Sequence, residues 1–155
     1  ARGTEASWPW IAPRLADPSI RPAPVDIAFA PDALRDLLEI RASSSLFRLE
    51  DASEVSARLS FPNTGPAQNA LVIAGHVDGQ GLADAGFGEI LYLFNVSPQA
   101  QVIDLPTERG KRYTLHPVHL SADAADTRPR EQARFDSAHG RFTVPPRTTL
   151  VYVLE

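Results

Sequence analysis

Ile90-Leu91-Tyr92-Leu93-Phe94-Asn95-Val96 is a nearly continuous run of apolar side chains. A glycine-rich segment, residues 78–88, comes just before it. The run is too short for an ordinary buried helix, and its aromatic and branched side chains favour extended backbone. It therefore predicts a central strand of a β-sheet.

Shorter patterns on both sides of this run predict further strands. Residues 55–61 alternate apolar with polar side chains, which is the period of a half-buried strand, and a Pro-Asn-Thr-Gly-Pro turn follows at 62–66. The other predicted strands are residues 71–77, 101–105, 113–120, the neighbourhood of Phe135, 142–144 and 149–154. About seven or eight short strands separated by turn signals predict a mainly β fold, an antiparallel β-sandwich.

The N-terminal part has a different composition. Six of the 14 prolines lie in the first 31 residues. Proline removes a backbone donor and restricts the residue before it, so residues 1–24 are predicted to form an irregular arm without a long helix or a central strand. Its apolar side chains suggest that the arm packs against a surface.

Residues 26–44 predict one α-helix. Asp26 is a candidate N-cap, and Pro31 is a complication, because the helix either loses a hydrogen bond there or restarts at that proline. Apolar positions spaced by three and four place one face together: Ile27, Ala30, Leu34, Leu37 and Leu38.

Composition limits the classes of function. The chain has 155 residues, 43% of them hydrophobic, with a net charge of −4 and no cysteine. No apolar run approaches the ~20 residues of a membrane span, and no basic cluster marks a nucleic-acid surface. The absence of methionine and the start at Ala1 suggest a fragment of a longer protein, and the absence of cysteine leaves the compartment open.

Several segments, in order, resemble one family. The segment Leu37-Leu38-Glu39-Ile40-Arg41-Ala42-Ser43-Ser44-Ser45-Leu46-Phe47-Arg48-Leu49 resembles the LLxIRxSSPLFRL signature of pullulanase-type α-1,6-glucosidases, within the α-amylase superfamily. Further matching segments are residues 8–9, 15–18, 21–24, 61–66, 93–95, 115–118, 142–145 and 148–153. Ser45 replaces the expected proline, and Pro31 interrupts the expected helix, so the resemblance leaves the start of that helix in doubt.

The resemblance implies a domain arrangement and a role. Residues 1–44 would be the tail of a catalytic (β/α)8 barrel, made of the arm and the last helix, and residues 45–155 a C-terminal β-sandwich. The parent would hydrolyse α-1,6-glucosidic linkages in pullulan, starch or glycogen. Its catalytic carboxylates would lie upstream of Ala1, so we assign no catalytic residue and expect this fragment to be no enzyme, with the barrel of the same chain as its partner. A bacterial parent is expected. Its localisation is unknown from the sequence, with secretion or the cell surface favoured over the cytoplasm.

Two tryptophans are the candidate substrate-binding residues. Trp8 and Trp10 could stack on sugar rings, although burial that anchors the arm is the simpler interpretation. This leaves two alternatives to a structural role for the domain: a carbohydrate-binding module that contacts α-glucan, and an independent Ig-like interaction domain.

No metal or cofactor is expected. His116 and His119 flank Pro117, which opposes a helix, and on a strand they would point to opposite faces. Asp78 and Asp84 in the glycine-rich loop keep calcium as an alternative without the spacing of a known loop motif. The glycines of this loop lack the spacing of a phosphate-binding loop, and Asn95-Val96-Ser97 is interpreted as part of a core strand rather than a glycosylation site.

Overall fold

The computed structural model describes residue 3 and residues 5–155. These residues form two compact units that divide between Asp32 and Ala33. Among the described residues, no helix combines the length and the apolar character that a membrane crossing requires.

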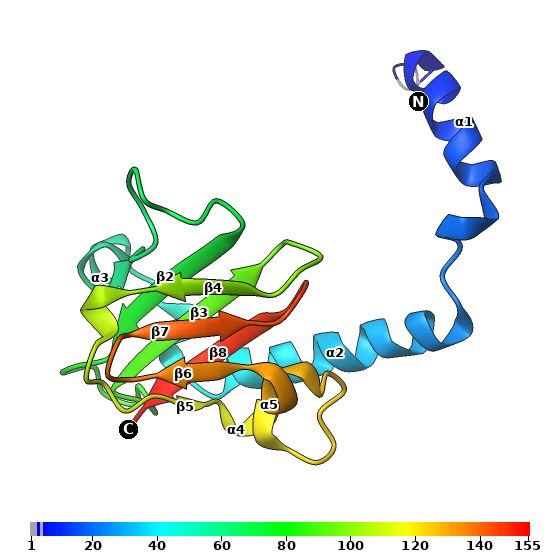
Figure 1. The fold of residues 1–155 in the computed structure, drawn as a ribbon. Helices are drawn as coiled ribbons and strands as arrows, with labels where there is room; N and C mark the ends of the chain where they lie inside the picture. The colour runs from blue at the N-terminus through cyan, green and yellow to red at the C-terminus, as the bar shows by residue number, and fades with distance from the viewer. Residues whose placement is uncertain (1–2, 4) are drawn as a thin grey trace. The chain divides into compact units, whose positions relative to one another are not determined.

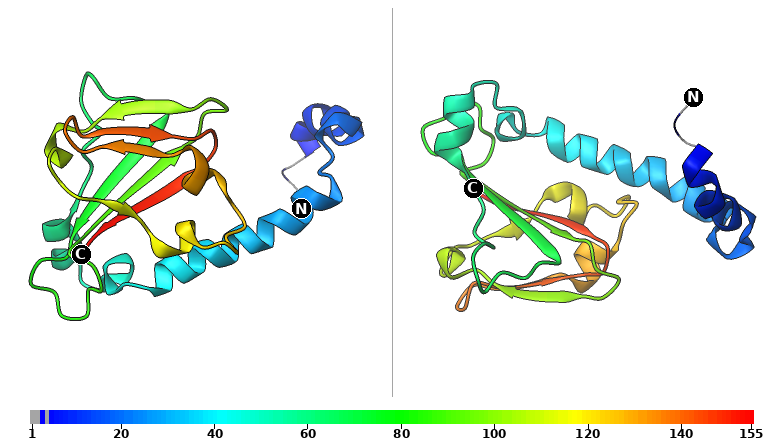
Figure 2. Two further views of the ribbon diagram at one scale, coloured as in Figure 1. Left: turned by 60° about the horizontal axis from the view of Figure 1, so that its bottom comes forward. Right: turned by 90° about the horizontal axis from the view of Figure 1, so that it is seen from above.

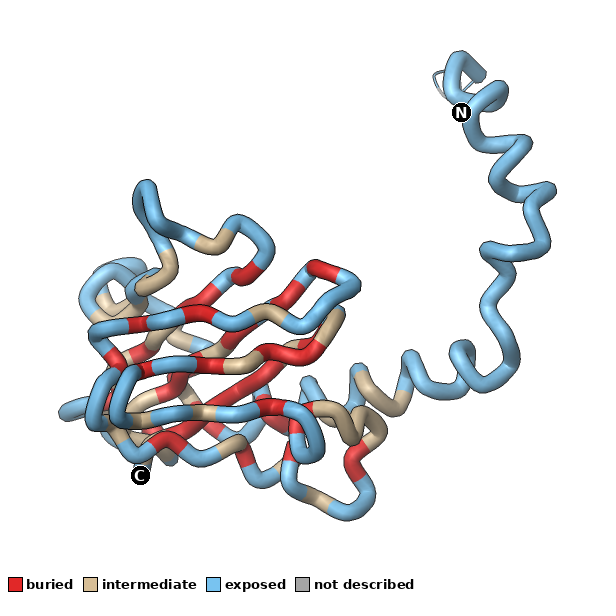
Figure 3. Tube along the Cα trace, in the orientation of Figure 1, coloured by how far each residue is buried: buried red, intermediate tan, exposed pale blue. Residues whose placement is uncertain are grey.

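The unit that ends at Asp32 is helical. It contains the 3-10 turns η1 (Glu5–Ser7) and η2 (Pro18–Ile20), the helix α1 (Trp8–Ala16) and the first part of α2 (Pro24–Ala42). The prediction of an irregular arm is therefore wrong for residues 8–16. Pro9 lies in the first turn of α1, where a missing N–H breaks no helical hydrogen bond, and only Pro13 lies inside the helix. All described residues from 5 to 31 are exposed (Figure 3).

Helix α2 is continuous through Pro31, so it does not restart there. Asp26 is not its N-cap. Its carboxylate lies in the first turn and accepts a hydrogen bond of 2.8 Å from the backbone N–H of Ala23, as in the second half of a capping box. Pro24 begins the helix, where its fixed φ is favourable, and the helix ends two residues before the predicted boundary.

The unit from Ala33 onward contains a sandwich of two antiparallel sheets, which Figures 1 and 2 show as separate layers. The larger sheet has the order β1-β2-β3-β8-β5, and the smaller has the order β4-β7-β6. The strands of the larger sheet are β1 (Leu59–Ser60), β2 (Val72–Asp78), β3 (Glu89–Asn95), β8 (Thr149–Leu154) and β5 (Thr114–Leu115). Those of the smaller sheet are β4 (Gln101–Asp104), β7 (Arg141–Val144) and β6 (Arg134–Asp136). The predicted mainly β, antiparallel sandwich is confirmed.

Strand β3 packs on both faces, fully on the inner face and partly on the outer face, where Phe94 is exposed, and this explains its apolar run. Leu91 and Leu93 point into the core between the sheets, whereas Ile90 belongs to a second cluster on the outer face of the larger sheet. Phe142, fully buried, stacks on Phe135 at 4.4 Å in the core between the sheets. A strand that packs on both faces carries apolar side chains at successive positions, whereas a strand with one face in solvent alternates apolar and polar side chains.

The end of α2 and the 3-10 turn η3 (Ser45–Arg48) cover part of that outer face. Ile40 and Leu46 are buried there beside Val77, Val151 and Val153. Ser44 caps η3 by accepting from the backbone N–H of Leu46, and its hydroxyl donates to a carbonyl of the glycine-rich loop, that of Ala85. These contacts tie the helix, the turn and the loop to the sheet.

Two predicted strands are partly helical. Residues 52–58 form α3 (Ala52–Arg58), because Asp51 caps the helix through the N–H of Ser53 and Glu54 pairs with Arg58 one turn later. Only β1 remains of that predicted strand.

The predicted strand 113–120 likewise keeps only β5, since Pro117 begins the short helix α4 (Pro117–Leu120). Helix α5 (Arg128–Gln132) and the 3-10 turn η4 (Pro106–Glu108) complete the described elements.

Candidate functional site

Trp8 and Trp10 are both exposed, at 59% and 77%, on helix α1. Residues two apart on a helix do not face each other, so the two indoles do not form one flat platform. Trp8 shares its side of the helix with Ile11 and Leu15, which lie three and seven positions on and are also exposed. Both tryptophans are therefore exposed on α1, and a role in glucan binding stays a prediction.

An apolar groove of about 400 Å³ opens on the outer face of the larger sheet. It lies between the second half of α2 and strands β3 and β8, and its lining is Leu37, Ile40, Arg41, Phe47, Tyr92, Phe94, Thr149 and Val151. The rings of Tyr92 and Phe94 contact each other with centroids 5.5 Å apart. Ile73 on β2 is the register partner of Phe94, so its side chain extends the same face, and it is 53% exposed.

Gly75 leaves room for an aromatic ring on this face. A Cβ on Gly75 would lie 2.1 Å from Cζ of Tyr92, so the tyrosine ring lies directly over the glycine. The absence of a side chain on β2 at this position allows the aromatic ring of β3 to lie flat across the sheet.

A buried ionic cluster closes one end of the core between the sheets. It consists of His76, Glu89, Glu108, Lys111 and Tyr113. The Lys111 ammonium lies 2.6 Å from Glu89 and 2.8 Å from Glu108, and the Tyr113 hydroxyl lies 2.8 Å from both carboxylates. Glu108 is 2% exposed. The members come from β2, β3, η4 and the segment between η4 and β5, so no local pattern in the sequence indicated this cluster.

Opposite charge decides the ionisation of the cluster. Burial alone would raise the pKa of Glu108, but hydrogen bonds from Lys111, Thr107 and Tyr113 outweigh it and bring the pKa below its usual value. Glu89 behaves in the same way, with burial opposed by hydrogen bonds from Lys111, His76 and Tyr113. Although burial opposes the charge of Lys111, its pKa is raised by the two carboxylates. Both acids are therefore held as carboxylates.

The described residues contain one group of three potential metal ligands, namely His76, Glu89 and Glu108, whose ligand atoms lie within 4.8 Å of one another. Oxygen and imidazole donors suit a divalent cation, but the Lys111 ammonium already bonds to both carboxylates. Asp78 and Asp84 are not in this group. Asp78 instead accepts from the backbone N–H of Gln80, at 2.8 Å.

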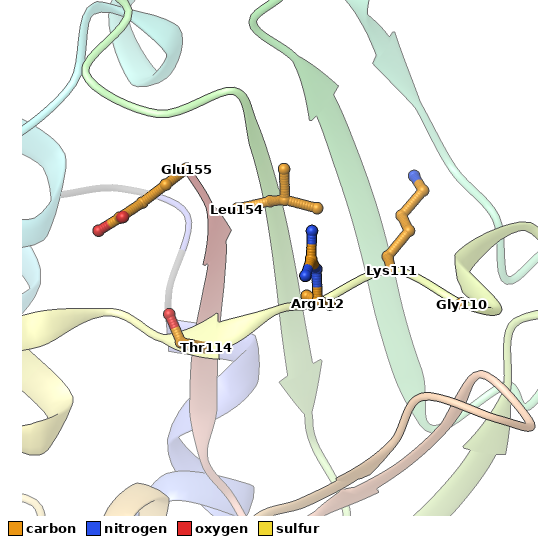
Figure 4. Close-up of a pocket in the computed structure, with 6 residues that line it drawn as sticks. All are labelled: Gly110, Lys111, Arg112, Thr114, Leu154 and Glu155. Atoms are coloured by element: carbon orange, nitrogen blue, oxygen red, sulfur yellow. The ribbon is translucent and has the colours of Figure 1, made fainter.

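A second, polar pocket of about 470 Å³ lies beside β5 and the end of β8 (Figure 4). Its lining is Gly110, Lys111, Arg112, Thr114, Leu154 and Glu155. These described lining residues include charges of both signs and no aromatic ring, so the pocket offers no stacking surface for a sugar.

His116 is the N-cap of α4 and His119 lies in that helix, contrary to the expectation that Pro117 would prevent a helix there. Proline is accepted because it occupies the first helical position. Both imidazoles are buried, and each uses a ring nitrogen to accept from a backbone N–H, so they are engaged in the structure of the domain.

Asn95 is 3% exposed at the end of β3. Its side-chain amide donates to the carbonyls of Gln99, Val144 and Pro145, and its oxygen accepts from the N–H of Ser97. Because both ends of the amide are used inside the fold, it joins the two sheets and is not presented to solvent.

Fold and surface together define a β-sandwich domain with a helix packed on the outer face of its larger sheet. The profile of the family "Alpha-1,6-glucosidases, pullulanase-type, C-terminal" matches residues 1–155, and the chain belongs to this family. It is 38% identical over 157 residues to "Pullulanase 1, chloroplastic" of Arabidopsis thaliana, covering 96% of this chain and 16% of that relative. The chain thus spans about one sixth of the relative's length, and this relative comes from a plant, so the expected bacterial origin is not confirmed.

Solved structures of the same kind share the fold. PulA of Klebsiella oxytoca matches with a TM-score of 0.73 and 24% identity, over 86% of this chain and 12% of that one. The pullulanase of Klebsiella pneumoniae complexed with maltotriose matches with a TM-score of 0.64 and 26% identity, over 77% and 11%. The chain is therefore a C-terminal domain of the pullulanase type.

Proposed function

We propose that this chain is a non-catalytic part of its parent enzyme, that it covers an apolar surface of the catalytic barrel and that it thereby stabilises the barrel. The observation that carries the proposal is the uncovered apolar face around the groove. Phe94, Leu37 and Ile73 are 37%, 38% and 53% exposed on that face. Since a soluble monomer rarely exposes a large contiguous apolar patch, a partner surface is expected there.

Helix α2 supports the same conclusion. Its Ile40 is buried against the sandwich, whereas Leu34 and Leu38, one turn apart, are 56% and 54% exposed. A helix with apolar side chains on a second side needs a second partner. Most of the length of the relative from Arabidopsis lies outside the region that this chain matches. We propose that the corresponding catalytic part of this chain's own parent is the partner surface.

The two close carboxylates do not support catalysis by the chain itself. A retaining glycosidase places its two carboxyl groups about 5 Å apart, and Glu89 and Glu108 have ligand atoms within 4.8 Å. The proton donor of such a pair needs a raised pKa, whereas the pKa of each of these carboxyls is lowered, and Glu108 is closed off from solvent. We expect no hydrolysis of pullulan by the 155-residue chain.

Deleting the sandwich from the full-length enzyme tests the structural role. An enzyme that ends after Ser44 is expected to aggregate or to melt at a lower temperature, because an apolar surface loses its cover. Unchanged melting and solubility would contradict the proposal.

A second candidate function is glucan binding through the exposed Trp8 and Trp10, which would hold α-glucan, as the maltotriose complex of the Klebsiella pneumoniae pullulanase suggests. Titrating the 155-residue chain with maltotriose in a calorimeter tests it. Saturable heat that disappears in Trp8→Ala or Trp10→Ala favours binding, and no heat favours the structural role alone.

A further inference from the structure

The buried pair His116 and His119 plays no part in the role proposed above. The two rings lie where α4 meets the end of α2 and strand β8, and they are 2% and 6% exposed. A buried imidazole that only fills space could be either tautomer or either charge state, but the hydrogen bonds of these two rings leave no such freedom.

The bonds around His116 fix its proton on Nε2. The Ser43 hydroxyl donates its only hydrogen to the carbonyl of Ile40 at 2.7 Å, so its 2.9 Å contact with Nε2 of His116 needs a hydrogen from the imidazole. On the other side of the ring, Nδ1 accepts from the backbone N–H of Val118 at 3.2 Å. His116 is therefore neutral, and it joins the end of α2 to the start of α4.

The bonds around His119 require an unprotonated Nε2, which accepts from the backbone N–H of Val151 on β8 at 3.1 Å. The backbone N–H of His116 donates to the carbonyl of the same Val151 at 2.8 Å. Val151 lies just beyond the β8 residues that pair with β5. Its N–H and its carbonyl are both bonded by residues at α4, namely His119 and His116. The N–H of Val151 is therefore accepted by a titratable imidazole nitrogen, in place of the backbone carbonyl that a paired strand would offer.

We propose that His116 and His119 form an acid-sensitive latch: while both rings are neutral, His119 holds α4 on β8 and His116 joins the end of α2 to α4, and protonation of the rings releases these contacts. A proton on Nδ1 of His116 or on Nε2 of His119 replaces an acceptor by a donor. That donor would face a backbone N–H that already points at it, and a charge would be buried in the joint.

The surroundings of the pair do not offset that charge. Asp36 on α2 and Asp126, between α4 and α5, are the acids that favour protonation of His119. Asp36 accepts from the N–H of Ala125, and Asp126 is paired with Arg128 at 2.7 Å, so both are already engaged. Burial, with repulsion from His116 added, brings the pKa of His119 down to about 4, and burial also lowers the pKa of His116.

The direction of the pH effect follows from these lowered values. The unfolded chain takes up protons at an imidazole pKa near 6.5, before the folded chain does. The contribution of the latch is complete above that pH and is lost as the pH falls toward the folded value. From His119 alone, the folding equilibrium constant is expected to fall about 30-fold between pH 8 and pH 5.

Imidazole nitrogen NMR on the 155-residue chain tests the geometry without any substitution. We expect the Nε2–H tautomer for His116, an unprotonated Nε2 for His119, and titration of both rings below their ordinary range. Titration of either ring near pH 6.5, with the fold intact and no change in hydrogen exchange at residues 36–43, would overturn the proposal.

Substitutions test the release itself. Asn at position 116 still accepts the N–H of Val118, and Gln at position 119 still offers an oxygen to Val151. The double variant H116N/H119Q should lose most of the 30-fold pH dependence seen by urea denaturation, whereas the matched control H139N, at an exposed histidine, should retain it. A double variant as pH-dependent as the parent chain would refute the latch, and if it fails to fold at pH 8 the NMR titration decides.

Discussion

Replacing Lys111 by methionine removes the cation that lies between the two carboxylates of the ionic cluster. In the native cluster the ammonium lies 2.6 Å from Glu89 and 2.8 Å from Glu108. Methionine keeps most of the length and the apolar stem of the side chain, so the change is mainly one of charge. It leaves two carboxylates at the Tyr113 hydroxyl, which has only one hydrogen to donate.

The expected loss follows from burial. Removing one partner of a buried ion pair costs about 3–5 kcal/mol, because the remaining charge is no longer compensated. The side chain of Glu108 is 3% exposed, whereas those of Lys111 and Glu89 are each 25% exposed, so water relieves part of the cost. We therefore expect a loss near the lower end, about 3 kcal/mol in the free energy of unfolding at pH 8.

The sign of the pH dependence is a sharper test than the loss itself. In the native chain the pKa values of Glu89 and Glu108 are lowered, so their contribution is present above the unfolded value and is lost as the pH falls through the folded one. Without Lys111, burial and mutual repulsion raise the pKa of at least one of these acids. The contribution of these acids then reverses, so the variant loses less stability than the native chain as the pH falls, while the contribution of the buried histidines is the same in both chains.

Urea denaturation of the Lys111→Met chain between pH 4.5 and pH 8 measures both effects. Adding Glu108→Gln to the variant should recover most of the loss at pH 8, because it removes the second charge. A variant whose stability falls in acid as steeply as that of the native chain would refute this account of the cluster.

Three other substitutions have defined expectations. Gly79→Ala should cost about 1–3 kcal/mol of stability, because its Cβ would meet the backbone oxygen of Phe87 at 2.4 Å. Gly75→Ala should cost less, because the Cβ at Gly75 meets the ring of Tyr92, which can move. Thermal melts of both variants check this order. Asn95→Ala should cost about 2–3 kcal/mol, because it removes the donors of three carbonyls inside the fold, and a urea midpoint that does not change would contradict the bridging role.

The sandwich could be predicted because its strands carry local signals. The apolar run 90–96 and the runs 71–77 and 149–154 are strands, as their patterns indicated, and the structure places them next to one another in one sheet. Residues 52–58 show where such reasoning fails. Their alternation of apolar and polar side chains fits a strand, but the Asp51 cap and the pairing of Glu54 with Arg58 favour a helix.

Pro117 was misinterpreted for a related reason, since proline opposes the interior of a helix but suits its first turn. The ionic cluster could not be predicted from sequence. His76, Glu89 and Lys111 are far apart along the chain and meet only because the register of β2 and β3 and the turn after η4 bring them to one end of the core.

The most direct test of the proposed role compares two exposed strand residues on opposite outer faces of the sandwich. Ile73 extends the apolar face around the groove and is 53% exposed, and Val102 lies on β4 of the other sheet and is 57% exposed. In the full-length enzyme, covering the exposed part of Ile73 is worth about 1 kcal/mol, and a carboxylate placed under the partner adds the cost of its desolvation. Melting of the full-length Ile73→Asp and Val102→Asp variants should show a clear loss for the first and little change for the second. Equal melting temperatures for the two variants would contradict the claim that this face covers the catalytic barrel.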